Sequence, residues 1–116
     1  MKAYQKFSFF CAILTGAIIF YMSSLSIASG SGGFAMLPFL YHFGIFFLLG
    51  FFLFLAFNSK KNFYFIIFLI CFSYAGLDEI HQLFVPGRAC DIFDFFVDSF
   101  GIISSFIFLK LENIFK

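Results

Sequence analysis

The stretch DEIHQLFVPGRACDIFDFFVD, residues 78–98, holds five of the six carboxylates of this 116-residue chain. It lies between two apolar runs, near residues 63–83 and 92–111, that are each long enough to cross a bilayer. An ionisable side chain inside a bilayer costs roughly 2.5 kcal/mol or more, so it persists where it faces a protein interior, a cavity or a partner. We therefore expect this stretch to join two membrane helices and to carry the function.

The composition of the whole chain is that of an integral membrane protein. Apolar residues make up 63% of it and charged residues 11%, far from the values of soluble globular domains. With 25 phenylalanines and no tryptophan, phenylalanine must fill most helix contacts and most of the lipid-facing surface. The net charge of +1 provides no basic face for nucleic acid, so we exclude nucleic-acid binding. The three cysteines include no CxxC pair, which argues against a disulfide framework or a zinc knuckle.

Four apolar segments predict the fold. A helix needs about 20 residues to cross roughly 30 Å of hydrocarbon, and such segments lie near residues 7–27, 34–57, 63–83 and 92–111. The breaks between them are short and carry turn residues, which favours antiparallel neighbours. The predicted fold class is all-α, a four-helix polytopic membrane bundle formed by a single domain over residues 1–116.

The basic residues predict the orientation of the bundle, because short loops rich in Lys and Arg stay in the cytoplasm. With four spans, six lysines fall on one side: Lys2, Lys6, Lys60, Lys61, Lys110 and Lys116. Both termini are then cytoplasmic, and the loop that contains Arg88 is extracytoplasmic. The first span also resembles a signal peptide, with small residues near 26–28; its apolar run is longer than usual for such a peptide, so we expect a retained helix.

The end of the third span offers several polar groups on neighbouring faces. Residues three and four apart share a helix face, so Asp78, His81 and Gln82 project together, and Glu79 lies on the adjacent stripe. The helix end thus presents an acid, an imidazole and an amide side by side.

The fourth span carries a polar stripe at intervals of three or four residues: Asp91, Asp94, Asp98, Gly101 and Ser105. Asp91 precedes the apolar run and is placed as a helix N-cap. Asp94 and Asp98 lie beyond capping range, and Asp98 is about 10 Å further along the axis than Asp91. We expect Asp94 and Asp98 to need shielding from lipid.

If these two helix ends pack together, their acids and His81 converge around Arg88, which the Pro86-Gly87 turn folds back over them. Arg88 then either forms a structural ion pair or contacts a ligand. Three carboxylates and an imidazole permit a divalent metal site, general acid and base chemistry or a proton relay. The sequence leaves these three open, since it has no HExxH, GxSxG or P-loop pattern.

His42 stands alone in the outer half of the second span. A single histidine in an apolar helix is most often a packed residue hydrogen-bonded to a neighbour, yet the topology places His42 at the depth of the acids. The hydroxyl and glycine residues of the spans, including Ser23, Ser24, Gly50 and Gly101, are explained by close helix packing.

The block DEIHQLFVPGR, followed by Asp94, Asp98 and Gly101, resembles the signature of the VanZ-like membrane proteins, a family named for a protein associated with teicoplanin resistance. The Ser23-Ser24 pair and His42 with Gly50 are also similar to that family. Two positions depart from its pattern. Ile45 stands where an acid often follows the histidine, and Asp98 stands where Asn is frequent. The resemblance implies a small helical protein of a bacterial or archaeal cell envelope.

Our leading functional hypothesis is an outer-face pocket that binds a polar ligand, such as a lipid-linked or phosphate-bearing headgroup, with Arg88 as the anion contact. In an enzymatic form the catalytic candidates are Asp78, Glu79, His81 and Asp94. The ligand-binding candidates are His42, Gln82, Arg88 and Asp98. The structural candidates are Pro86, Gly87, Asp91 and Gly101. The alternatives are a non-catalytic assembly protein, in which the polar block locks the helices together, and a proton- or ion-coupled transporter.

Overall fold

A computed structural model describes residues 1–25, 36–58, 61–86 and 92–112. These residues form long helices and one short 3-10 turn, and they contain no strand: α1 (Ala3–Ser24), α2 (Met36–Ala56), η1 (Lys61–Phe63), α3 (Tyr64–Leu83) and α4 (Ile92–Leu111). All four α-helices are long and apolar enough to cross a membrane. The predicted all-α class and its four spans are therefore confirmed.

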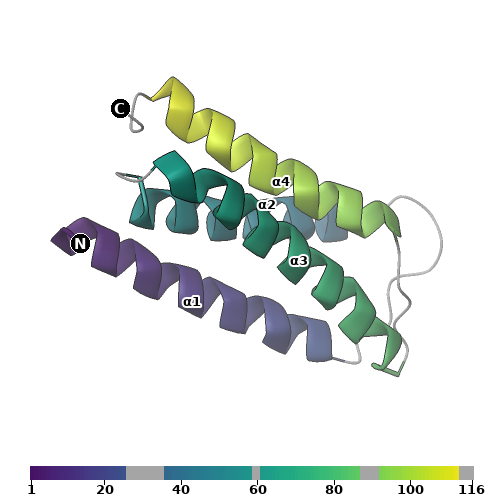
Figure 1. The fold of residues 1–116 in the computed structure, drawn as a ribbon. Helices are drawn as coiled ribbons and strands as arrows, with labels where there is room; N and C mark the ends of the chain where they lie inside the picture. The colour runs from purple at the N-terminus through teal and green to yellow at the C-terminus, as the bar shows by residue number, and fades with distance from the viewer. Residues whose placement is uncertain (26–35, 59–60, 87–91, 113–116) are drawn as a thin grey trace.

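The helices run antiparallel to their neighbours in sequence, as Figure 1 shows. The bundle measures 45 × 23 × 20 Å, longer than the roughly 30 Å of a bilayer's hydrocarbon core. The end where α1 and α3 finish and α2 and α4 begin is called the motif end. The opposite end, which carries Lys2, Lys6 and Lys110, is called the basic end. The chain therefore separates its described lysines from its acidic motif by the length of the bundle.

Helix α2 packs against each of the other three helices, and its interface with α4 is the most extensive. Helices α1 and α4 lie at opposite corners and do not touch in the part of the chain that the structure describes. Helix α3 contacts all three other helices, and the extent of contact decreases from α4 to α2 to α1. The weak contact between α1 and α3 leaves room for an opening on that side of the bundle.

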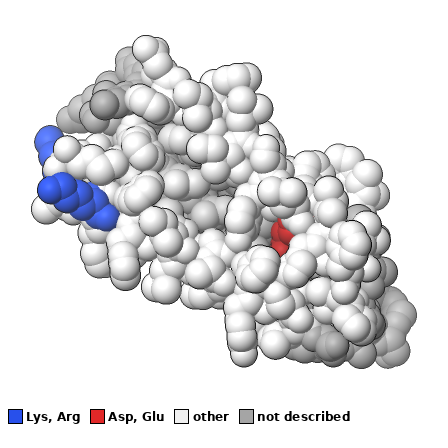
Figure 2. Space-filling model, turned by 60° about the horizontal axis from the view of Figure 1, so that its bottom comes forward, with Lys and Arg blue, Asp and Glu red and all other residues white. Residues whose placement is uncertain are grey.

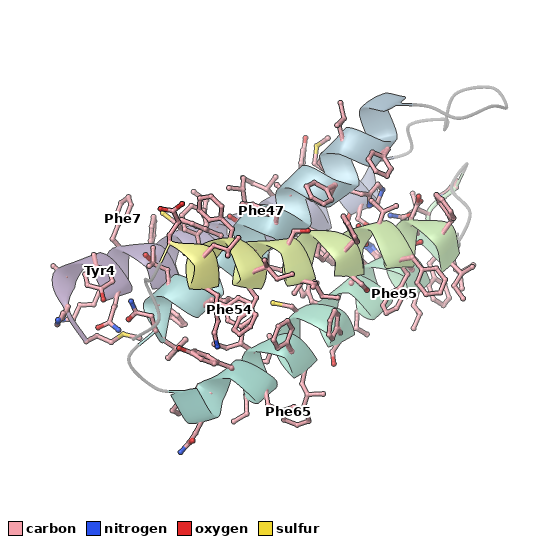
Figure 3. All side chains as sticks on the ribbon, turned by 90° about the horizontal axis from the view of Figure 1, so that it is seen from above. Tyr4, Phe7, Phe47, Phe54, Phe65 and Phe95 are labelled. Atoms are coloured by element: carbon pink, nitrogen blue, oxygen red, sulfur yellow. The ribbon has the colours of Figure 1, made fainter. Side chains whose placement is uncertain are left out.

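The interior of the bundle is more polar than its surface. The buried face of α1 repeats every three or four residues: Gln5, Ser8, Ala12, Thr15, Ile19 and Ser23. Ser8 and Thr15 donate hydrogen bonds to carbonyls one turn earlier, at 2.8 and 2.7 Å. Figure 3 shows Phe7 and Phe65 pointing away from the bundle, while Phe54 points between the helices. Because lipid is as apolar as a leucine side chain, small and polar residues help to hold such helices together, and many of the phenylalanines can face lipid.

Helices α2 and α4 approach closely at Gly101. A Cβ atom at this position would lie 2.5 Å from the Phe43 carbonyl oxygen and 3.1 Å from the Phe47 nitrogen. A Cβ atom at Gly50 would collide with Ser105 Oγ, whereas one at Gly44 would meet nothing within 4 Å. The contact at Gly101 is therefore backbone to backbone, and it sets the register between α2 and α4.

Candidate functional site

Four buried polar side chains meet near the motif end: His42 from α2, Asp78 and Glu79 from α3, and Asp98 from α4. Their exposed fractions are 6%, 7%, 3% and 0%. One ligand atom from each residue lies within 4.8 Å of the others. These four residues are called the polar cluster.

The shortest contact in the polar cluster is a hydrogen bond between His42 Nδ1 and Asp98 Oδ1, at 2.8 Å. Asp94, one turn earlier on α4, places an oxygen 3.8 Å from His42 Nε2. His42 therefore takes its acidic partners from α4.

The fold brings Asp98 to His42 through the glycine contact. Gly101 lets α4 rest against the backbone of α2 at Phe43, the residue that follows His42. Asp98 lies three residues before Gly101, so it shares the same face of α4. On α3, Gln82 lies one turn after Asp78, and its Nε2 atom donates a hydrogen bond of 3.5 Å to Asp78 Oδ2.

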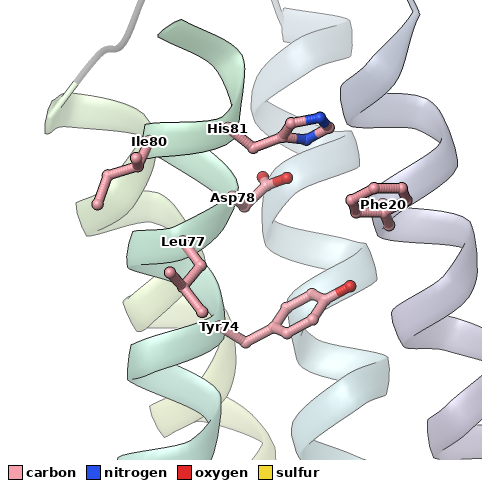
Figure 4. Close-up of a pocket in the computed structure, with 6 residues that line it drawn as sticks. All are labelled: Phe20, Tyr74, Leu77, Asp78, Ile80 and His81. Atoms are coloured by element: carbon pink, nitrogen blue, oxygen red, sulfur yellow. The ribbon is translucent and has the colours of Figure 1, made fainter. Parts of the chain in front are cut away.

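A hollow of about 360 Å³ opens between α1 and α3, close to the polar cluster. Its lining residues are Phe20, Tyr74, Leu77, Asp78, Ile80 and His81. Figure 4 shows Tyr74, Asp78 and His81 pointing from α3 toward Phe20 of α1. In Figure 2 acidic atoms are visible at the bottom of a depression on this face, and the lysines gather at one end. We call this cavity the α1–α3 hollow; Asp78 belongs both to it and to the polar cluster.

His81 lies in the wall of the α1–α3 hollow and not in the polar cluster. Its ring stacks on Phe20, with centroids 4.8 Å apart and planes at 1°. Its Nδ1 atom is 3.2 Å from Ser23 Oγ. Tyr74 donates a hydrogen bond from its hydroxyl to the carbonyl of Gly16. These contacts join α1 to α3 on either side of the hollow.

The structure thus brings together some of the residues predicted from the sequence and separates others. Asp78, Glu79, Asp98 and His42 converge, Asp94 lies at their edge, and Gln82 supports Asp78. Pro86 is exposed at the end of its segment. Gly87, Arg88 and Asp91 lie outside the described residues.

Three residues in or beside the hollow, Ser23, Phe20 and Tyr74, were not identified as site residues from the sequence. Ser23 was assigned to helix packing, and Phe20 and Tyr74 are aromatic residues within apolar spans. The signal for Ser23 was its place in the pair Ser23-Ser24 at the end of the first span. Phe20 has no distinguishing signal, because the chain holds 25 phenylalanines.

The donor atoms of the polar cluster can hold a cation or share protons. Three carboxylates around one imidazole form a donor set suited to a divalent ion. Without an ion, such groups must be protonated or paired, because an isolated charge is too costly in an apolar interior.

Comparison with known proteins identifies a family. Residues 7–115 match the family model described as VanZ/LLP1. No curated protein and no solved structure matches the sequence significantly.

Proposed function

The chain belongs to the VanZ/LLP1 family, and from this premise we propose that this multi-pass membrane protein binds an amphipathic lipid of the cell envelope in the α1–α3 hollow. The lipid enters sideways from the bilayer, and its polar headgroup reaches Asp78 and His81. The observation that carries the proposal is an apolar hollow, open beside the membrane helices, with an acid and an imidazole in its wall.

The lining of the α1–α3 hollow supports an amphipathic occupant. Phe20, Leu77 and Ile80 are all more than half exposed, so in a membrane their side chains meet lipid. Ligand pockets of roughly 300–1,000 Å³ are mostly apolar and use a few polar groups for orientation. The hollow, at about 360 Å³, has this character and suits an acyl chain whose headgroup lies at its polar wall.

The polar groups indicate the headgroup chemistry. A carboxylate such as that of Asp78 accepts hydrogen bonds, so it suits a headgroup with hydroxyl or ammonium donors. A phosphate in the same headgroup is assigned to Arg88, whose planar guanidinium suits that anion. In the predicted orientation the motif end faces the outside of the cell. Teicoplanin susceptibility of cells that express the chain is accordingly a useful cellular readout.

Replacing Leu77 by tryptophan is expected to reduce lipid binding about tenfold, equivalent to about 1.4 kcal/mol, because the larger side chain fills the α1–α3 hollow. The measurement is labelling by a photoactivatable phospholipid in vesicles, followed by mass spectrometry of the labelled peptide.

Leu69→Trp is the matched control for this variant. Leu69 lies on the same helix, is 50% exposed against 62% for Leu77, and does not line the hollow. Equal labelling of the two variants at wild-type yield would contradict the proposed lipid site.

A catalytic function on the same lipid is the second candidate, favoured by the place of Asp78 in both the hollow and the polar cluster. In that case Glu79→Gln and His81→Ala should abolish conversion of the lipid while the folded protein still accumulates. If Glu79 and His81 only lock the helices together, the same variants should lower thermal stability in detergent before they lower function. Measuring unfolding temperature and function on one preparation separates these outcomes.

A further inference from the structure

We propose that His42, Asp78, Glu79 and Asp98 form a binding site for one divalent transition-metal ion, Zn²⁺ or Mn²⁺, inside the membrane bundle. The site joins three helices at the motif end. It is independent of the lipid proposal, since it requires no occupant in the α1–α3 hollow.

The geometry of the four donors is close to that of a metal centre. One atom from each residue lies within 4.8 Å of the others. Donor atoms about 2.0–2.2 Å from a tetrahedral Zn²⁺ stand about 3.4 Å from one another. An inward movement of each donor atom by about 1 Å or less therefore closes the site.

Asp98 provides a second, independent observation. It is fully buried, with an exposed fraction of 0%, and its Oδ1 atom bonds to His42. Its Oδ2 atom has no hydrogen-bond partner among the residues that the structure describes. Buried carboxylate oxygens almost always have a hydrogen-bond partner. The geometry therefore points to a partner for Asp98 Oδ2 that the described residues do not supply.

The charge of the polar cluster is compatible with a bound cation. Three carboxylates lie within one small volume, and a divalent ion would offset two of their negative charges.

Neighbouring residues are placed to orient the ligands. Gln82 lies 3.5 Å from Asp78, and Asp94 lies 3.8 Å from His42 Nε2. Such outer contacts fix the orientation of metal-bound carboxylates and imidazoles. An imidazole together with carboxylates favours Zn²⁺ or Mn²⁺, whereas Ca²⁺ and Mg²⁺ take oxygen ligands alone.

The test is metal binding by the purified full-length chain in detergent, after removal of bound ions with EDTA. Zn²⁺ and Mn²⁺ are added separately, and bound metal is measured by mass spectrometry after desalting. We expect one ion per chain for at least one of the two metals. Asp98→Asn should weaken binding about 100-fold, and Glu79→Gln should weaken it similarly.

Two controls keep the outcome clear. Glu112→Gln removes a carboxylate from the basic end and should bind metal as the wild type does. Asp98→Asn keeps an oxygen that accepts the hydrogen bond from His42, so it is expected to fold; metal should raise the unfolding temperature of the wild type and leave that of Asp98→Asn unchanged. Less than about 0.1 ion per folded wild-type chain, or equal binding by Asp98→Asn, Glu79→Gln and the wild type, would overturn the proposal.

Discussion

Replacing Gly101 by alanine is expected to lower the free energy of unfolding by about 3 kcal/mol, at the upper end of what a single added methyl group costs in a packed interior. The new Cβ atom would lie 2.5 Å from the Phe43 carbonyl oxygen. This oxygen belongs to the helix backbone and cannot rotate away, so α2 and α4 must separate. The measurement is the midpoint of thermal unfolding in detergent, followed by circular dichroism.

Gly44→Ala is the matched control, because a Cβ atom at Gly44 meets nothing within 4 Å. Gly44 lies on α2, one residue after Phe43. The free energy of unfolding of Gly44→Ala should be within about 0.5 kcal/mol of the wild-type value. Gly101→Ala should also lengthen the His42–Asp98 hydrogen bond, because this bond and the Gly101–Phe43 contact depend on the same register between α2 and α4. Equal stability of the two alanine variants would show that the helices do not approach as closely as described.

The fold was predictable because the length of an apolar run limits where a membrane helix can end. The fourth span was predicted over residues 92–111 and forms Ile92–Leu111. The third was predicted over 63–83 and forms Tyr64–Leu83 after the turn η1. The first helix begins at Ala3, earlier than the predicted residue 7, because Gln5 accepts a hydrogen bond from the Lys2 nitrogen at 2.8 Å. Hydropathy does not detect such a local cap.

Parts of the candidate site follow from periodicity along one helix. The predicted stripe on α4 places Asp98, Gly101 and Ser105 together, and all three are buried. Asp94 belongs to the same stripe, but its side chain is 32% exposed. Contrary to the prediction that it lies beyond capping range, Asp94 is within the first turn of α4, where the bundle no longer surrounds it.

The pairing of His42 with Asp98 was not predictable in this way. Periodicity within α2 or α4 gives the face on which each residue lies, but not the register between the two helices. That register depends on the contact of Gly101 with Phe43. The separation of His81 from the polar cluster has a similar cause, since it depends on Ser23 and Phe20 of α1. The α1–α3 hollow likewise arises from the loose contact of two helices that are distant in the sequence.

Replacing His42 by alanine is expected to lower the free energy of unfolding by about 3–5 kcal/mol, the usual cost of leaving one member of a buried ion pair alone. Asp98 would lose the 2.8 Å hydrogen bond to His42 Nδ1 while its side chain stays fully buried. The measurement is thermal unfolding in detergent without added metal, compared with the exposed α2 variant Leu40→Ala.

The double variant His42→Leu/Asp98→Leu distinguishes loss of the pair from loss of packing. Replacing both members of a buried pair by apolar residues is often neutral or stabilising, because neither is left without its partner. The double variant should therefore be more stable than the single variant His42→Leu, with a coupling energy of about 1–3 kcal/mol. If the effects of His42→Leu and Asp98→Leu were simply additive, the hydrogen bond would contribute little, and the stability of this end of the bundle would come from the contact of α2 with α4 at Gly101.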